Sequence, residues 1–312
     1  MVTLRADFIG ALKVDLYGTF FETYQRFDTM YDKIFEVVPS TGAYAQSFVT
    51  TGMGDLLERP EGDDIVFEKL GGGRMVIGKN RTFSKGIEIT QETIEDSSEE
   101  VIRNLVTDKI SIVAESYVRS KEKWAARFFN KGGIVLGDNI FNNTVAGITD
   151  PTGNLTYDGK PFFNLAGNPR SSLGGGTYFN GHALALSAAN LQAVYTNMVG
   201  NANRDENDDF IDVKPTTLLI PPGLHFTAKP ILESEKVLGS NNNDPNPVAN
   251  LVNLMEWSYL TDADAWFLGV PKRGLKWTDR RKPVIDIYQN PINRNYLVTV
   301  DARWGAWMDN FR

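Results

Sequence analysis

Cysteine is absent from this chain of 312 residues, and histidine occurs only twice, at His182 and His225. The lack of cysteine excludes disulfide bonds, thiol nucleophiles, iron–sulfur clusters and zinc sites built on cysteine. A metal or acid–base centre on the two histidines would have to recruit carboxylates from distant parts of the chain. We therefore predict no catalytic residue, no cofactor and no metal site, and we interpret both histidines as structural.

Long hydrophobic runs are also missing. No apolar stretch approaches the ~18 residues that a membrane helix requires, and the first residues lack the charged-then-apolar order of a signal peptide. We expect no membrane association, and we do not interpret the Asn-x-Thr matches at Asn80, Asn142 and Asn154 as glycan sites. The hydrophobic content of 42% is ample for a packed core.

Basic residues are not in excess. The chain has 39 acidic and 32 basic side chains, a net charge of −7, whereas proteins that grip duplex nucleic acid offer a basic surface. We therefore expect no sequence-specific nucleic-acid binding.

Three motifs look like ligand sites but lack essential parts. Asp205, Asn207 and Asp209 have the spacing of a calcium loop, but Phe210 stands where glycine should turn the chain and Thr216 where a bidentate glutamate belongs. The glycine triplets at 71–73 and 174–176 lack the Gly-Lys-Ser/Thr of a phosphate-binding loop. The carboxylates between 92 and 100 stand at a helix start, where the helix dipole favours them.

Residues 58–92 predict an extended arm. Short apolar runs at 65–70 and 75–79 flank Gly71–Gly73, which is the usual signal of a β-hairpin, and the return limb continues to residue 89. An isolated two-stranded hairpin is marginal in water, so we expect the arm to lie on another copy of the chain. The expected contact residues between copies are Ile65, Phe67, Lys69, Met75, Val76, Ile77 and Lys79.

A long helix is predicted directly after the arm, over residues 98–131. Ser98 can cap its N-terminus, and Gly132 and Gly133 follow its end. Apolar residues recur at steps of three, four or seven and form one stripe: Ile102, Val106, Ile110, Val113, Tyr117, Trp124 and Phe128. At 1.5 Å per residue such a helix spans roughly 50 Å.

The rest of the chain mixes helices and strands without a regular βαβ period, which predicts an α+β protein. Helical patterns occur in residues 1–35, 184–200 and 228–238, and residues 137–181 read as loops and short strands. The first pattern fits a helix that packs within its own subunit and equally a segment that packs on a neighbour. A buried central strand is expected at 216–220, and further strands at 252–260, 265–270, 284–288 and 296–300.

The order of these segments resembles the major capsid protein of tailed bacteriophages, and most closely the Mu-like major head subunit group. The run from Phe83 through Ile87-Glu88-Ile89 to Ile94-Glu95-Asp96 matches the entry into that family's spine helix. A second match covers residues 211–222 with Ala228 and Ile231-Leu232 after it. A third is the ending at 296–305. Each motif alone is loose, and their order and spacing carry the resemblance.

The resemblance implies a phage major-capsid fold with an N-terminal arm at 1–57 and an extended β-hairpin arm, the E-loop, at 58–92. A peripheral domain would comprise 93–181 and 284–312, with the spine helix at 98–131, and an axial domain would comprise 182–283. The implied function is structural: self-assembly into pentamers and hexamers of an icosahedral shell around double-stranded DNA. The implied location is the virion capsid, assembled in the host cytoplasm, and the implied partners are copies of itself, portal and scaffolding proteins and a decoration protein.

Two other functions remain open from the sequence. An encapsulin-like compartment shares the shell architecture but encloses an enzyme rather than a genome. A β-rich carbohydrate- or ligand-binding protein would use Trp257, Trp266 and Trp277 as a stacking platform.

Overall fold

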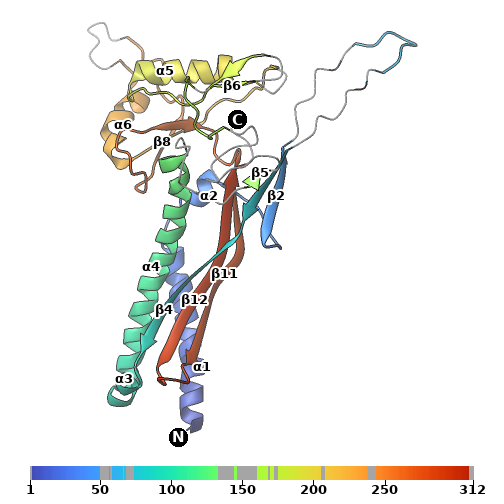
Figure 1. Ribbon diagram of the computed structural model, residues 1–312. Helices are drawn as coiled ribbons and strands as arrows, with labels where there is room; N and C mark the ends of the chain where they lie inside the picture. Colours follow the sequence, from blue (N-terminus) through green and yellow to red (C-terminus); the bar gives the residue numbers. More distant parts are fainter. Residues whose placement is uncertain are drawn as a thin grey trace.

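The protein is elongated, with a long body, a compact lobe and a projecting arm (Figure 1). The computed structural model describes residues 2–49, 56, 58–65, 67, 74–132, 144–145, 160–167, 169–171, 175–204, 208–237 and 244–308. Helices and strands mix along the chain without a βαβ repeat, so the predicted α+β class is confirmed.

The body is built on a sheet of four strands in the order β1-β11-β12-β4. These strands are β1 (Glu36–Val37), β11 (Leu275–Gln289), β12 (Tyr296–Met308) and β4 (Arg81–Ile89). β11 and β12 form a long antiparallel hairpin, β4 pairs antiparallel with β12, and β1 pairs parallel with β11.

Two helices cover one face of this sheet. The spine helix α4 (Glu99–Lys131) starts one residue after the predicted position and ends at the predicted one, so the prediction is confirmed. Its apolar stripe packs with α1 (Val2–Gln25) against the sheet, and Leu16 and Phe20 of α1 are fully buried there. Residues 13–25 therefore pack as a helix of their own subunit.

The lobe contains a three-stranded sheet in the order β10-β8-β9, with two helices packed against it. Its elements are β8 (Thr217–Ile220), β9 (Asn253–Glu256), β10 (Phe267–Gly269), α5 (Ala188–Asn197) and α6 (His225–Glu233). All four residues of β8 are buried. Because β8 has a partner on each edge, the prediction of a buried central strand is confirmed.

Shorter elements connect these units. They are α2 (Tyr31–Ile34), α3 (Gln91–Asp96), β6 (Arg170–Ser171), β7 (Thr177–Tyr178), a π-helical turn (Met198–Ala202) and a 3-10 turn (Pro222–Leu224).

The hairpin β11–β12 is longer than the strands predicted at 284–288 and 296–300. The charged run 279–282 interrupts the apolar alternation that identifies a strand. Backbone pairing with β12 nevertheless continues across it through two irregularities, between Asp279 and Arg281 and between Arg281 and Val284. β11 also runs unbroken through residues 283 and 284, where the sequence placed a domain boundary.

The prediction that residues 81–89 continue the arm is wrong. β4 pairs over its whole length with β12 of the same chain, from Arg81 opposite Trp304 to Ile89 opposite Tyr296. Ile89 is buried in the cluster beneath the helices. A strand with an apolar face finds its partner inside the subunit because β12 offers a free edge there.

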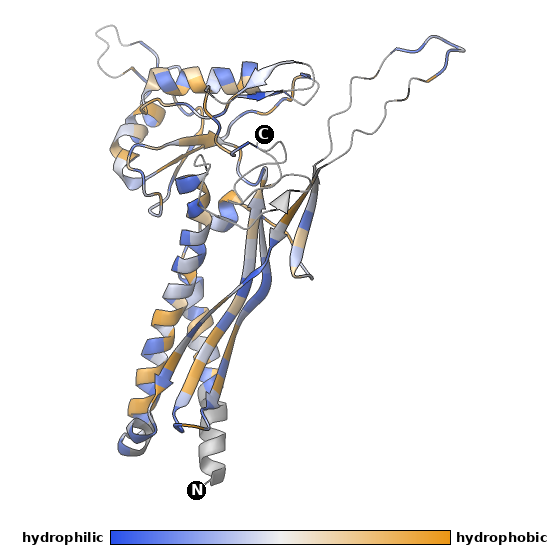
Figure 2. Ribbon diagram, in the orientation of Figure 1, coloured by the Kyte–Doolittle hydropathy of each residue, from blue (hydrophilic) through white to orange (hydrophobic). Residues whose placement is uncertain are grey.

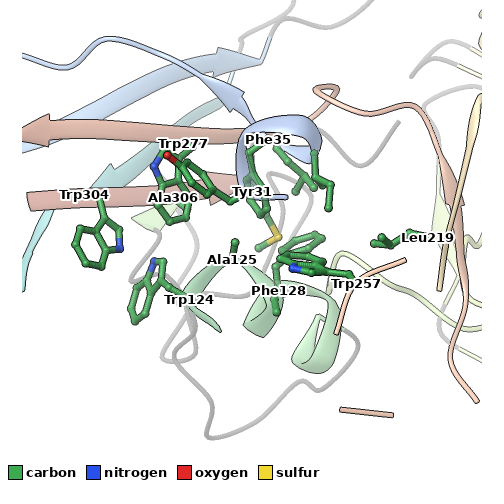
Figure 3. Packing of buried hydrophobic residues seen from close by; sticks show 14 of the residues in the cluster. Tyr31, Phe35, Trp124, Ala125, Phe128, Leu219, Trp257, Trp277, Trp304 and Ala306 are labelled. Carbon is green, nitrogen blue, oxygen red and sulfur yellow. The ribbon is translucent and has the colours of Figure 1, made fainter. Parts of the chain in front are cut away.

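An aromatic core joins the body to the lobe (Figure 3). It contains Trp124 and Phe128 of α4, Phe35, and the buried indoles of Trp257, Trp277 and Trp304, together with Leu219 of β8. The hypothesis of an aromatic stacking platform is therefore wrong, because Trp257 is 2% exposed and Trp277 is fully buried. These rings stabilise the chain and are not available to a ligand.

Two adjacent charged residues of α4 are buried in this region. The Lys121 ammonium lies 2.7 Å from the Asp279 carboxylate and 3.1 Å from the Tyr31 hydroxyl, above the rings of Tyr31, Tyr117 and Trp277. Burial lowers the pKa of Lys121, and Asp279 opposes that shift. Burial together with the nearby charge of Asp279 also raises the pKa of Tyr31.

The Glu122 carboxylate connects three parts of the chain. One oxygen accepts hydrogen bonds from the backbone N–H groups of Met30 (2.8 Å) and Tyr31 (3.2 Å), and the other accepts from the indole of Trp257 at 2.6 Å. Burial raises the pKa of Glu122 above its usual range, and the three hydrogen-bond donors oppose that shift in part. An ionised carboxylate can accept all three bonds, because it carries no proton of its own to oppose a donor.

We predict that Glu122→Gln lowers the free energy of unfolding by about 1–3 kcal/mol, because an amide N–H₂ would face a buried donor that it cannot bond. Chemical denaturation measures the loss. The control is Glu115→Gln on the exposed face of the same helix, which should change stability by less than about 0.5 kcal/mol. Equal effects of the two substitutions would contradict the bridging role of Glu122.

Candidate functional site: the projecting arm and its root

The base of the arm is a two-stranded ribbon of β2 (Tyr44–Val49) and β3 (Arg74–Lys79). The strands are antiparallel, with Tyr44 opposite Lys79 and Val49 opposite Arg74, and β5 (Thr144–Val145) pairs with the other edge of β3. The expected pairing of 75–79 with 65–70 is therefore wrong. β2 lies outside the segment that we predicted as the arm. The alternation of apolar and polar residues is weak between Thr41 and Thr50, so the sequence does not indicate a strand there.

The described part of the arm's tip turns at Pro60–Asp63. The Asp63 N–H donates to the Pro60 carbonyl at 3.3 Å, and Gly62 has a φ of 94°. A positive φ at the third position of a turn favours glycine, so a Pro-x-Gly-Asp signal was present in the sequence. The turn predicted at Gly71–Gly73 lies outside the described residues.

Apolar side chains on the arm are exposed to solvent. Ile65 is 60% exposed and Phe67 is 86% exposed. Leu56, which is not among the predicted contact residues, is fully exposed. Every described residue between 56 and 67 is exposed, and Figure 1 shows the described tip held far from the body. The described part of the subunit therefore offers these side chains no apolar surroundings.

The other predicted contact residues belong to the base of the arm. Met75 and Ile77 are partly buried and Lys79 is exposed. Val76 is fully buried within its own chain, so it has no apolar surface left for a neighbour. Lys69 lies outside the described residues.

A tryptophan of the body anchors the arm. Trp307 of β12 is 1% exposed, and its indole N–H donates to the Ser47 hydroxyl of β2 at 2.9 Å. Its ring lies directly on Gly78 of β3, where an added Cβ would come within 2.5–2.9 Å of the ring atoms. The absence of a side chain at Gly78 is therefore what allows the ribbon to lie on β12.

Asn80 ties the same root to the sheet of the body. Its side-chain N–H₂ donates to the Ser40 hydroxyl (2.9 Å) and the Gly42 carbonyl (3.1 Å). Its side-chain oxygen accepts from the Thr278 hydroxyl at 2.6 Å, and its backbone N–H donates to Ala43 at 3.1 Å. Asn80 is 2% exposed, so it is a structural residue and not a glycan acceptor. We call the contacts of Trp307, Gly78, Ser47 and Asn80 the arm root.

The two histidines, and the described part of the acidic run at 205–209, have structural partners. His225 lies 2.7 Å from the Glu256 carboxylate, and His182, whose pKa burial lowers, lies 3.5 Å from the Asn197 amide. Of the acidic run at 205–209, residues 205–207 lie outside the described part, and the Asp208 carboxylate accepts hydrogen bonds from Gly176 N–H and the Tyr178 hydroxyl.

Within the described residues, no cluster of three or more histidine or carboxylate side chains is placed to hold a metal ion. None of the helices that the structure describes combines the length and apolar character of a membrane span.

Solved structures with the same fold include the capsids of two phages. The capsid of bacteriophage JBD30 matches with a TM-score of 0.51 at 16% identity, over 75% of this chain and 91% of that chain. The capsid of cyanophage P-SCSP1u matches with a TM-score of 0.50 at 10% identity, over 91% of this chain and 86% of that chain. At such low identity the likeness shows the fold. No curated protein matches the chain.

A family model described as phage capsid protein matches residues 78–308, well over half of the chain. The matched segment begins at the arm root and runs through the spine helix, the lobe and the long hairpin. The chain thus belongs to the phage capsid protein family and is a structural, shell-forming capsid protein rather than an enzyme.

Proposed function

We propose that this protein assembles into pentamers and hexamers of an icosahedral shell around double-stranded DNA, and that each copy lays its arm on an adjacent copy. The observation that carries the proposal is the exposure of Leu56, Ile65 and Phe67 on a projection that touches no other described part of its subunit. Monomeric proteins seldom place large apolar side chains together on such a projection unless a partner covers them.

The burial of these side chains supplies the driving force. Covering a side chain of the size of leucine, isoleucine or phenylalanine contributes about 1.5–3 kcal/mol. Association costs several kcal/mol in lost translational and rotational freedom, so a single arm contact is weak. In a closed ring each copy gives one arm and receives one, and the contacts sum because the symmetry closes. Misplaced copies can still leave before the ring is complete.

The arm root sets the direction in which the arm projects. Trp307 and Gly78 press the β2–β3 ribbon onto β12, and Asn80 joins the turn after β3 to β11. Because these contacts are buried, the ribbon cannot rotate freely about its attachment. A fixed direction limits the angles at which two copies can meet, which a shell of defined curvature requires.

The resemblance to phage capsid proteins supports a further assignment, of the units of the fold to positions in the shell. We assign the lobe of α5, α6 and β8–β10 to the axis of the ring, and the body of α1, α4 and the four-stranded sheet to its periphery. Because β11 is continuous from Leu275, we place the boundary between them before that residue. Assembly in the host cytoplasm, with portal, scaffolding and decoration proteins as partners, belongs to the same proposal.

We predict that Ile65→Ser combined with Phe67→Ser abolishes assembly and leaves the subunit folded. Both side chains are exposed in the subunit, so its thermal unfolding should not change, while the apolar area that drives association is removed. Sedimentation velocity and negative-stain microscopy measure the particles. The control, Ile65→Val with Phe67→Leu, keeps the apolar character and should assemble. Closed particles of normal size from the serine variant would show that the arm does not drive assembly.

We predict that Gly78→Ala destabilises the subunit by about 1–3 kcal/mol, because the new methyl group overpacks the buried ring of Trp307. The control is Gly86→Ala in β4, where an added Cβ meets Thr299 at an ordinary 3.4 Å. Denaturant titration of the two variants compares them. Similar stability of both would mean that the ribbon shifts away from Trp307 without cost.

A further inference from the structure

A basic cluster lies on the face of the body sheet that the helices leave open. It consists of Arg280 and Arg281 at the irregular part of β11 and Arg303 of β12, which together with Thr82 line a cleft of about 240 Å³. Lys282 follows directly in the sequence and is also exposed. Arg281 and Arg303 stand directly opposite each other in the antiparallel pair. Like charges at such positions repel and destabilise the sheet unless an acidic group lies between them.

This subunit does not supply that acidic group from its described residues. Of the nearest carboxylates in the sequence, Asp279 is bound to Lys121 at 2.7 Å, and Asp301, two residues before Arg303 on β12, forms no ion pair with a described residue. Arg280 and Arg281 are exposed, and no described carboxylate forms an ion pair with either of them or with Arg303. Within the described residues, Arg303 donates to the Asn80 carbonyl, at 3.4 Å. Figure 2 shows this stretch of β11 as strongly hydrophilic.

The arm tip carries the complementary charge. Residues 58–65 contain four carboxylates (Glu58, Glu61, Asp63 and Asp64) and one arginine (Arg59), a formal charge of −3. All of these residues are exposed, and none forms an ion pair within the described part of the chain. The net charge of the tip is therefore opposite in sign to that of the basic cluster.

We infer that the acidic arm tip of one copy docks on the basic cluster of the adjacent copy. The inference rests on the proposed function and names the surface that receives the arm. Ile65 and Phe67 supply the apolar area of the contact, whereas the charges define its register, since complementary charge contributes specificity more than affinity. The tip is held away from the basic cluster of its own subunit (Figure 1), so a second copy is the occupant that satisfies both groups.

Cysteine cross-linking tests the contact directly, because the chain has no cysteine of its own. The variant with Asp63→Cys and Arg281→Cys carries only two thiols. Under mild oxidation during assembly, we expect a ladder of covalent oligomers on non-reducing gels, which a reductant collapses to the monomer. The control pairs Asp63→Cys with Glu115→Cys on the exposed face of α4, and should give no ladder. A cross-linked monomer, or no cross-link at all, would overturn the inference.

Charge reversal tests the same contact without cysteine. The tip-reversed variant carries Asp63→Lys and Asp64→Lys, and the cluster-reversed variant carries Arg280→Glu and Arg281→Glu. Neither should assemble alone, since like charges then face each other at every contact. An equimolar mixture should recover rings of six, in which the two variants alternate and each tip meets the opposite charge on the other variant. A ring of five cannot alternate in this way, so the ring size is read from the particles by negative-stain microscopy. Thermal unfolding of both variants verifies that the exposed substitutions leave the subunit folded.

The outcomes separate this inference from the proposed function. If both charge-reversed variants assemble normally while the Ile65→Ser, Phe67→Ser variant does not, the arm drives assembly but docks elsewhere. If the cluster-reversed variant assembles normally and loses affinity for duplex DNA, the basic cluster is a DNA contact and the inference is wrong. High salt should slow the assembly of the unmodified protein, because screening weakens exposed charge pairs.

Discussion

The buried carboxylate of Glu122 is the contact on which the arrangement of the subunit depends. It lies on the spine helix. One of its oxygens accepts hydrogen bonds from the backbone N–H groups of Met30 and Tyr31 at the start of α2, and the other accepts from the indole of Trp257. These three segments are far apart in the sequence and belong to the N-terminal region, the body and the lobe. Because a buried acceptor without its donors is costly, the three segments move together, and the lobe keeps a fixed position at the end of the helix.

A shell subunit needs this combination of rigid and uncovered parts. The body is rigid because helices, sheet and aromatic core share buried surface along the whole length of α4. The arm is attached rigidly at its root, yet its described tip is fully exposed. In the proposed assembly, the rigid root would preserve the angle between neighbouring copies, and the apolar side chains of the tip would become buried only when a neighbouring copy covers them.

Charged side chains are compensated in the interior of the subunit but not on the open face of its sheet. Inside the protein, Lys121 and Glu122 each have partners that compensate for their burial. On the open face of the sheet, Arg281 and Arg303 stand opposite each other and have no acidic partner among the described residues. Such an unbalanced pair is tolerated in a single subunit because solvent screens it. In the docking that we infer, the acidic arm tip of another copy would balance it.

Local patterns in the sequence determined the spine helix, the buried strand β8 and the exposed character of Ile65 and Phe67, because helical periodicity and turn residues act over a few neighbours. Only the tertiary structure decided that β3 pairs with β2, that β4 pairs with β12 and that β11 continues through a run of charged residues. Backbone hydrogen bonds between strands do not depend on which side chains the strands carry, so the sequence alone does not name the partner. The burial of Val76 and of the tryptophans follows from those pairings.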